Sequence, residues 1–451
     1  MRRHVQTNRP TPLSLYAPRS TAIMDVSEEK AGVPMAQQHD KKATKKFGPM
    51  HFIMGFGIVS MLMDIVYEAA LSVQGPLLYS VGATAAVVGI VSGIGEATSL
   101  AGRLVSGPAA DRTGRYWTFA ILGYAATGLA VPAMGFVGSV FGVSFLIVLE
   151  RFGKSLRTPS RDAMLSHAAA KVGRGKGFAL HEALDQVGAI AGPLLAAAIL
   201  QATHNAFGPA LGVMIVPGLA AIGVLLFLKC RVPKPEIFEQ EDGAALAAEH
   251  IEDETESPTA KQARGQAQPL KLPLLFWVYT GFCAIVLAGV GTFGVMSYHM
   301  VATGLIATPA TPVIYAIAMA VDGVFALLTG ALYDKIGTKA LLALPVASAL
   351  IPFFVYTDNT AFVVFGVILW GASLGIQEST MRAAVADMVP GCKRATSYGL
   401  FSVFIGIGAL IGASATGILY AYGQSAIVSY TMALETAALI ALAITLYLAK
   451  R

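Results

Sequence analysis

The sequence predicts an all-α membrane protein with twelve transmembrane helices, arranged as two pseudo-symmetric bundles of six. Three observations lead to this fold: the composition, the series of apolar stretches and an internal repeat. Of the 451 residues, 55% are hydrophobic and only 13% are charged, and the mean hydropathy is +0.63. Soluble domains carry roughly 25% charged residues. The composition therefore excludes an ordinary soluble enzyme and a disordered regulator.

Apolar stretches of about 20 residues, each long enough to span a bilayer, follow one another along the chain. They are expected to begin near Met50, Ala85, Trp117, Gly142, Gly177, Gly208, Leu272, Val313, Ala340, Phe362, Ser397 and Ala426. The polar segments between and before them predict four parts: a basic cytoplasmic tail (1–47), a first bundle (48–229), an acidic cytoplasmic linker (230–271) and a second bundle (272–451).

The distribution of basic residues predicts the orientation. The N-terminal tail, every second loop and the C-terminus hold 29 of the 32 Lys and Arg residues, and the six opposite loops hold none. By the positive-inside rule, both termini and the linker are cytoplasmic. The net charge of +5 is thus a topology signal, and no nucleic-acid partner is expected. We expect a monomer in the bacterial inner membrane.

The first 24 residues contain four arginines and no acidic residue. They fit a transit peptide, a basic tail at the membrane surface, or sequence upstream of a start at Met24 or Met35. A cleavable secretory signal is not expected, because no apolar core follows the arginines.

An internal repeat relates the two halves. Gly107, Asp111 and Gly114 recur 223 residues later as Gly330, Asp334 and Gly337, and Arg174, Gly188 and Gly192 recur 220 residues later as Arg394, Gly408 and Gly412. A repeat of about 220 residues that covers six spans is typical of transporters built from two related halves.

The loop after the second span resembles the signature of the major facilitator superfamily. Residues 107–115 read Gly-Pro-Ala-Ala-Asp-Arg-Thr-Gly-Arg, and Tyr116 then replaces the usual basic residue. The resemblance implies alternating access, with a gating loop in which Asp111 contacts helix 11 and stabilises the outward-facing state. The residues assigned to this loop and its weaker copy are Gly107, Asp111, Arg112, Gly114, Arg115, Asp334, Lys335 and Gly337.

Helix 5 contains Gly188, Gly192 and Pro193, and Ala196 follows where drug:proton antiporters of the superfamily have a further glycine. Glycines four apart also mediate packing in many membrane helices, and the proline bends the span. Helix 4 differs from the antiporter pattern, since Arg151 is followed by Phe152 and not by Gln. Other stretches look like poorly characterised bacterial permeases of the same superfamily.

Charged residues inside the spans indicate the functional site, because each costs about 2.5–3.5 kcal/mol at the bilayer centre. Nine are acidic and three basic: Asp64, Glu68, Glu96, Glu150, Glu182, Asp185, Asp322, Glu378 and Glu435, with Arg103, Arg151 and Arg382. The predicted substrate cavity and proton-coupling residues are Asp64, Glu68, Glu150, Arg151, Glu182, Asp185 and Asp322. Cytoplasmic gate candidates are Arg157, Arg161, Glu378 and Arg382. The sequence assigns no role to Glu435.

The excess of acidic groups favours a cationic or neutral substrate, with protons as the coupling ion. Proton-coupled export of a small organic compound is the leading hypothesis. Proton-linked uptake or facilitated transport of a polar metabolite is the first alternative, and a non-transporting receptor or scaffold with the acidic linker as a docking segment is the second. An enzyme is not expected, because the chain lacks catalytic and nucleotide-binding motifs. No cofactor or metal is expected, since three cysteines lie far apart.

Overall fold

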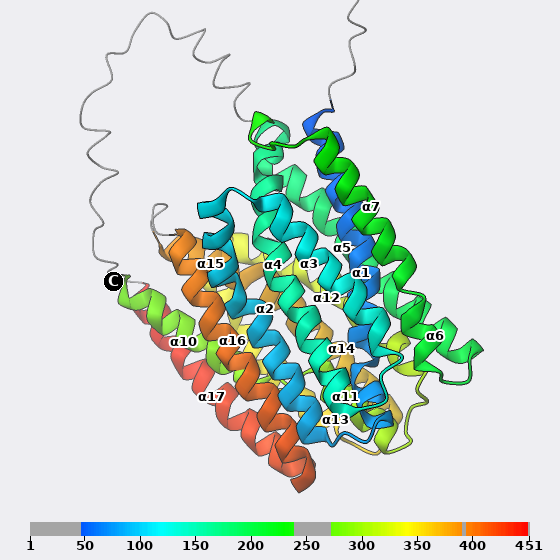
Figure 1. The fold of residues 1–451 in the computed structure, drawn as a ribbon. Helices are drawn as coiled ribbons and strands as arrows, with labels where there is room; N and C mark the ends of the chain where they lie inside the picture. The colour runs from blue at the N-terminus through cyan, green and yellow to red at the C-terminus, as the bar shows by residue number, and fades with distance from the viewer. Residues whose placement is uncertain (1–46, 239–271, 390–393, 450–451) are drawn as a thin grey trace, which may run out of the picture. The chain divides into compact units, whose positions relative to one another are not determined.

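The computed structural model describes residues 47–238, 272–389 and 394–449, and this part of the chain folds into helices and short connections (Figure 1). Each apolar stretch starts within three residues of its predicted position. The predicted basic tail and most of the predicted acidic linker lie outside the described residues.

Seven helices form the first half. They are α1 (Pro49–Ser80), α2 (Ala85–Thr113), α3 (Tyr116–Met134), α4 (Val140–Val172), α5 (Arg174–Ala202), α6 (Phe207–Gly212) and α7 (Ile215–Arg231). A short turn separates α6 from α7 within one apolar stretch. Helix α1 packs against α5 and α7, and α4 packs against α2 and α3.

The second half contains more interrupted helices. Its elements are α10 (Leu274–Gly289), α11 (Phe293–Ala302), α12 (Ala310–Ile336), η1 (Gly337–Leu342), α13 (Ala343–Val355), α14 (Thr360–Ile376), η2 (Gln377–Met381), α15 (Arg382–Met388), α16 (Arg394–Leu419), η4 (Tyr420–Tyr422) and α17 (Gln424–Leu448). Helix α10 packs against α16 and α17, and α14 packs against α12 and α13.

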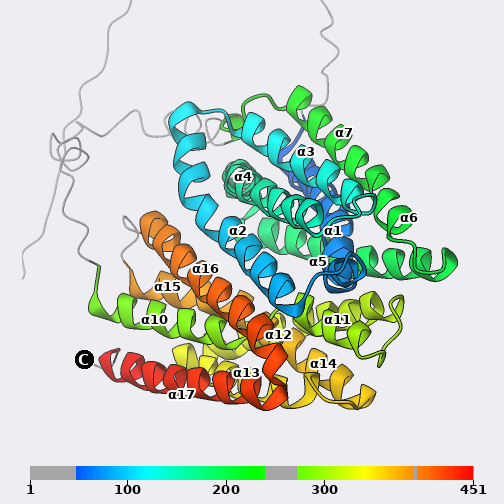
Figure 2. The ribbon, with the colours of Figure 1, turned by 60° about the horizontal axis from the view of Figure 1, so that its bottom comes forward.

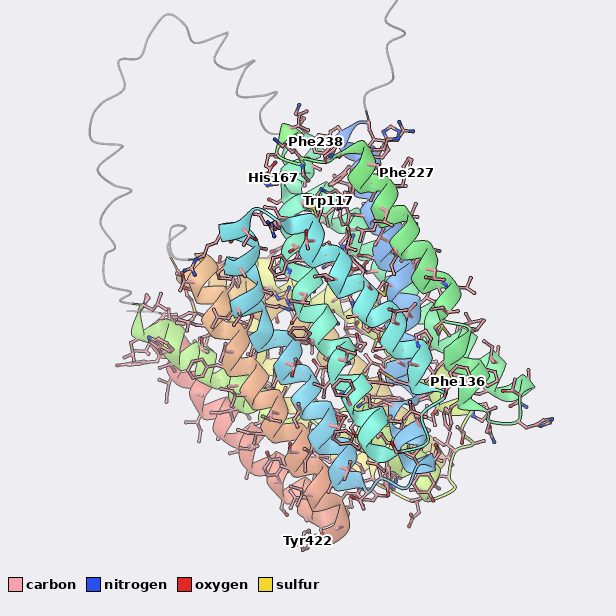
Figure 3. The ribbon with its side chains drawn as sticks, viewed as in Figure 1. Trp117, Phe136, His167, Phe227, Phe238 and Tyr422 are labelled. Atoms are coloured by element: carbon pink, nitrogen blue, oxygen red, sulfur yellow. The ribbon has the colours of Figure 1, made fainter. Side chains whose placement is uncertain are left out.

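Three helix pairs make most of the contacts between the halves: α2 with α16, α1 with α11, and α5 with α12. Figure 2 shows α1–α7 together in one group and α10–α17 together in another, and the paired helices lie where the two groups meet. We define the linker end as the end of the helices where α1 and α10 begin and α7 and α17 end. Trp117 and Phe238 lie at the linker end and Tyr422 at the opposite end (Figure 3).

Within the described residues, ten helical stretches are long and apolar enough to cross a membrane. One of them, Ala310–Val355, is 46 residues long and contains both α12 and α13. Helix α4 has 33 residues but is absent from the ten. Its charged residues lower the hydropathy, and five of them (Glu150, Arg151, Lys154, Arg157 and Arg161) fall within twelve positions.

The internal repeat is visible in the backbone. Gly114 ends α2 with φ 63°, and its counterpart Gly337 ends α12 with φ 62°. A backbone with positive φ favours glycine, which has no Cβ atom. Upstream, Gly107 faces Pro159 of α4, and Gly330 faces Ser379 of η2. The two copies of the sequence motif therefore both turn at a glycine with positive φ and face equivalent helices, although ψ is 14° at Gly114 and −145° at Gly337.

A second set of repeated glycines sets the distance between helices. Gly188 and Gly192 of α5 lie directly against the carbonyl groups of Met61 and Ile65 in α1. Their counterparts in α16, Gly408 and Gly412, lie against the carbonyl groups of Ala284 and Leu287 in α10. None of the four positions has room for a Cβ atom, so each pair of helices packs backbone to backbone.

Candidate functional site: an acidic cavity between the two halves

A cavity of about 390 Å³ lies between the halves and is lined by residues of both. Seven acidic side chains line it: Asp64, Glu68, Glu96, Glu182, Asp185, Asp322 and Glu378. Four basic side chains line it: Arg103, Arg151, Lys154 and Arg382. The cavity has the size of a small-ligand pocket, and carboxyl groups outnumber basic groups around it.

The predicted site residues fall into two groups. Asp64, Glu68, Arg151, Glu182, Asp185 and Asp322 line the cavity. Glu150 does not; it pairs with Arg151 and lines a much smaller void beside Tyr67. Of the predicted gate residues, Glu378 and Arg382 line the cavity, whereas Arg157 and Arg161 lie outside its lining.

Arg151 pairs with two carboxylates. Its guanidinium group lies 3.2 Å from Glu96 on α2 and 3.3 Å from its neighbour Glu150. Arg151 and Glu150 are both buried. One oxygen of Glu150 has no hydrogen-bond partner among the described residues. Because one positive charge serves two negative charges, this group of three side chains keeps a net negative charge when all are ionised.

Glu68 connects the two halves. The hydroxyl group of Tyr315 on α12 donates a hydrogen bond of 2.5 Å to the Glu68 carboxylate on α1. At the preceding residue of α1, the Lys154 ammonium group lies 4.3 Å from the ring centroid of Tyr67, a cation–π contact. Arg157, which the sequence assigns to the gate, makes a second cation–π contact with the ring of Tyr67 and donates a hydrogen bond to the Thr127 hydroxyl group.

Aromatic side chains form one wall of the cavity. The ring centroid of Phe293 lies 4.6 Å from that of Tyr315 and 5.7 Å from that of Trp370. These rings line the same cavity as the carboxyl groups of α1 and α5. Trp370 is not among the predicted site residues, because an aromatic residue in a membrane helix carries no signal that separates cavity from lipid.

Asp185 lies in a network that extends from the cavity towards the linker end. Its carboxylate is 3.6 Å from Arg161 and 3.5 Å from His181, one helical turn earlier. Arg161 also pairs with Asp162 at 3.0 Å and donates a hydrogen bond to Ser60. The second Asp185 oxygen is buried without a partner among the described residues. Asp185 therefore has both a basic partner and a free acceptor.

Asp322 of α12 is a buried carboxyl group of the cavity with one unpaired oxygen atom. Only 5% of the residue is exposed, and its Oδ1 atom has no hydrogen-bond partner in the described part of the chain. Beside it, the Gln186 amide of α5 donates a hydrogen bond to the Met319 carbonyl, which ties the two halves together.

Close contacts join the halves at the opposite end of the molecule. Gly75 of α1 lies against the Gly294 carbonyl of α11, and Gly89 of α2 lies against the Ala413 carbonyl of α16, with no room for a Cβ atom at either position. Beyond them, the ring of Tyr298 lies 5.3 Å from that of Tyr79 and 5.7 Å from that of Tyr420. This end is therefore closed by backbone contacts and an aromatic layer.

The predicted gating loop lies away from the cavity. Asp111, Arg112 and Arg115 are exposed, as are Asp334 and Lys335 of the second copy. The Tyr116 hydroxyl group donates a hydrogen bond of 2.9 Å to Asp111. The residue that departs from the family signature is thus the one that binds the signature aspartate. Among the described residues, no group of three His, Cys, Asp or Glu side chains is arranged to hold a metal ion.

Comparison with known proteins gives consistent matches. The family model described as Major Facilitator Superfamily matches residues 52–356 and 304–451. The uncharacterized protein Rv2265 of Mycobacterium tuberculosis is 46% identical over 389 residues, which cover 86% of this chain and 91% of the relative. The uncharacterized MFS-type transporter MJ1317 of Methanocaldococcus jannaschii is 24% identical and covers 85% and 90%.

A solved structure of a mutant of the nucleoside transporter NupG matches the fold with a TM-score of 0.67 at 13% identity. The match covers 86% of this chain and 99% of that structure. At this identity the likeness establishes the fold alone.

Proposed function

Because the chain belongs to the Major Facilitator Superfamily and is a multi-pass transporter of the bacterial cell membrane, we propose that it exports a small organic cation or neutral compound in exchange for protons. The observation that carries this proposal is the charge of the cavity, where seven carboxyl side chains stand against four basic ones. A cavity with excess negative charge attracts cations and disfavours anions.

The aromatic wall supports an organic substrate. Phe293, Tyr315 and Trp370 offer ring faces, which attract ammonium and similar cations through cation–π contacts. The carboxyl groups of the same cavity would bind the charged end of the same molecule. A cavity of about 390 Å³ accommodates one small organic molecule and no macromolecule.

Proton coupling follows from competition for the same carboxyl groups. An ionised carboxyl group without a full partner is unfavourable inside a membrane, and either a proton or a cationic substrate relieves this cost. Asp64 and Asp185 line the cavity on neighbouring helices and are the proposed coupling residues. Arg151 holds Glu96 and Glu150 nearby. Protons that enter displace the substrate, and the substrate displaces protons on the return step.

We also propose the twelve-span topology with both termini in the cytoplasm. It adds α4 to the ten apolar stretches and divides Ala310–Val355 into two spans, α12 and α13. The burial of the charges of α4 against other helices supports its place in the membrane: Arg151 and Arg157 are both buried. In this topology the linker end is cytoplasmic, and the structure is closed on the outer side.

Flux measurements on the purified protein in liposomes test the proposal. Ethidium, glucose and succinate serve as cationic, neutral and anionic probes, each with and without an imposed pH gradient. We expect the pH gradient to drive accumulation of ethidium and to leave succinate unaffected. Gradient-driven uptake of glucose in the proton direction would favour the polar-metabolite symporter instead. A protein that moves none of several compounds of each class would fit a receptor and contradict the proposal.

A further inference from the structure

His299 of α11 lies in the aromatic layer at the end of the molecule where the two halves are closed. The residue is only 5% exposed. Its ring centroid lies 5.6 Å from that of Tyr356 and 5.6 Å from that of Tyr420. Tyr420 in turn contacts Tyr298, and Tyr298 contacts Tyr79 of the first half. A change at His299 therefore acts on the layer that closes this end.

Both ring nitrogens of His299 have a hydrogen-bond partner. Nε2 lies 3.3 Å from the Thr357 carbonyl oxygen, and Nδ1 lies 2.9 Å from the Tyr420 hydroxyl oxygen. Because a carbonyl oxygen can only accept a hydrogen bond, Nε2 carries the proton. Nδ1 is then an acceptor, and the Tyr420 hydroxyl group donates to it. The two partners therefore fit the neutral form of the ring.

A positive charge on His299 would be poorly compensated in this arrangement. Asp358, between α13 and α14, is the one charged side chain that acts on His299 in the described part of the chain. Asp358 is exposed, so water screens its charge. The titratable neighbours from α1 and η4 are the neutral Tyr79 and Tyr420. The last turn of α11 favours a cation, but burying an ion without a close counter-ion costs more.

Opening of this end would expose His299 to water, where a histidine takes up a proton at roughly pH 6.5. The closed arrangement instead holds the neutral ring. A proton that binds better in the open arrangement shifts the population towards it. The closed arrangement is therefore favoured at high pH, and acidification on this side favours opening.

We propose that His299 is the pH sensor of an outer gate formed by Tyr79, Tyr298 and Tyr420: the neutral ring keeps the gate closed, and protonation opens it. The proton binds at Nδ1, which then donates and no longer accepts. The Tyr420 hydroxyl group has to accept in its place, and its own hydrogen atom loses its acceptor. The inference rests on the alternating access and topology proposed above, but not on the substrate or on proton exchange in the cavity.

Distance measurements between two spin labels test the proposal without a transport assay. The labels are attached to cysteines that replace Phe136, after α3, and Tyr422 of η4, in a background without the three native cysteines. Both positions are exposed, and they belong to different halves (Figure 3). In the purified full-length protein in detergent, we expect the short distance to dominate at pH 8. The ratio of closed to open protein should fall about tenfold between pH 8 and pH 5.

The His299→Gln variant keeps a neutral donor and a neutral acceptor but cannot be protonated in this pH range. It should stay closed from pH 8 to pH 5. His204→Asn is the matched control, because His204 is an exposed histidine in the connection after α5, at the same end. Its φ of 52° is a conformation that asparagine adopts readily. This control should open at low pH as the wild type does.

The carboxyl groups of the cavity also titrate, and the double variant Asp64→Asn, Asp185→Asn separates their effect from that of His299. We expect this variant to open at low pH whether or not the two carboxyl groups couple protons to transport, so the two proposals fail separately. A double variant that no longer responds to pH, together with an unchanged response in His299→Gln, would assign the effect to the cavity and overturn the inference.

If His299→Gln fails to fold, Tyr420→Phe provides a second test. It keeps the ring and removes the hydroxyl group that stabilises the neutral imidazole, so opening should occur at a higher pH than in the wild type. The same midpoint in Tyr420→Phe and in the wild type would contradict the role of His299. So would a wild-type distance that does not change with pH.

Discussion

At the residue scale, Arg151 and the carboxylates around it form the best-defined part of the site. Arg151 joins Glu96 on α2 to Glu150 on α4 through distances of 3.2 and 3.3 Å. Removal of one partner from a buried ion pair leaves an uncompensated charge, and this costs more than replacing the whole group by neutral residues. The role of this arginine is therefore testable through stability as well as through transport.

We predict that Arg151→Met lowers the free energy of unfolding by about 3 kcal/mol, because Glu150 loses its buried partner. The triple variant Arg151→Met, Glu96→Gln, Glu150→Gln should recover most of this loss, since no unpaired charge remains. Thermal unfolding in detergent measures both. Equal stability of the single and triple variants would show that the arginine acts through packing and not through charge.

Charge makes many of these side chains predictable from the sequence. A carboxyl group in a membrane helix needs a partner, water or a proton, so the amino-acid sequence alone assigns Asp64, Glu68, Asp185 and Asp322 to a polar cavity. The aromatic wall could not be predicted, because Trp370 or Phe293 is as stable against lipid as against a ligand. Glu150 does not line the cavity, and spacing along a helix does not define which neighbour a side chain faces.

At the element scale, the closed end of the molecule depends on helix contacts without side chains. Gly75 lies against α11 and Gly89 lies against α16. Glycines at these positions let helices approach closely. A larger side chain would hold the halves apart at this end, where alternating access requires them to close and open.

We predict that Gly89→Leu moves the two halves apart at the end opposite the linker end and abolishes transport. Distance measurements between spin labels on the start of α2 and on η4 should show a longer distance than in the parent protein. Gly281→Leu is the matched control, because a Cβ atom at Gly281 meets nothing within 4 Å. Identical distances in Gly89→Leu and the parent protein would refute the proposed role of this contact.

The gating loop allows a second prediction at this scale. Tyr116 donates a hydrogen bond to Asp111, and the family signature assigns Asp111 to stabilising the outward-facing state. We predict that Asp111→Asn shifts the population towards the inward-facing state and slows transport. Tyr116→Phe should have a smaller effect in the same direction, since it removes one neutral donor. Spin labels at the linker end measure both, and an unchanged distribution in Asp111→Asn would mean that Asp111 only anchors the loop.

Helix starts are predicted well because apolar stretches and polar loops alternate clearly. The interruption between α10 and α11 is not predicted. Gly289 and Gly291 mark it in the sequence, but α1 and α2 also contain glycines two residues apart and are not broken there. Side-chain donors from other helices stabilise the interruption, among them Trp370, Tyr430 and Thr431. Such tertiary compensation has no local signal.

At the scale of the whole molecule, the orientation in the membrane is the first claim to test. We predict that cysteines placed at Ser80, Asn205 and Asp358 in a cysteine-free background react with a membrane-impermeant maleimide added to intact cells. A cysteine at Lys234 should react only after the membrane is permeabilised. Reaction of the cysteine at position 234 in intact cells would show that this loop is outside the cell, and it would contradict the assignment of the linker end to the cytoplasm.

The central claim is that the acidic cavity exchanges protons for an organic cation. Liposomes that contain the protein and a trapped pH-sensitive dye test it most directly. Addition of ethidium outside should move protons outward in the wild type and in the surface control Asp358→Asn. The same addition should move none in the double variant Asp64→Asn, Asp185→Asn, provided that this variant is folded. Equal proton movement in the double variant and the wild type, or ethidium flux without proton movement, would contradict the account.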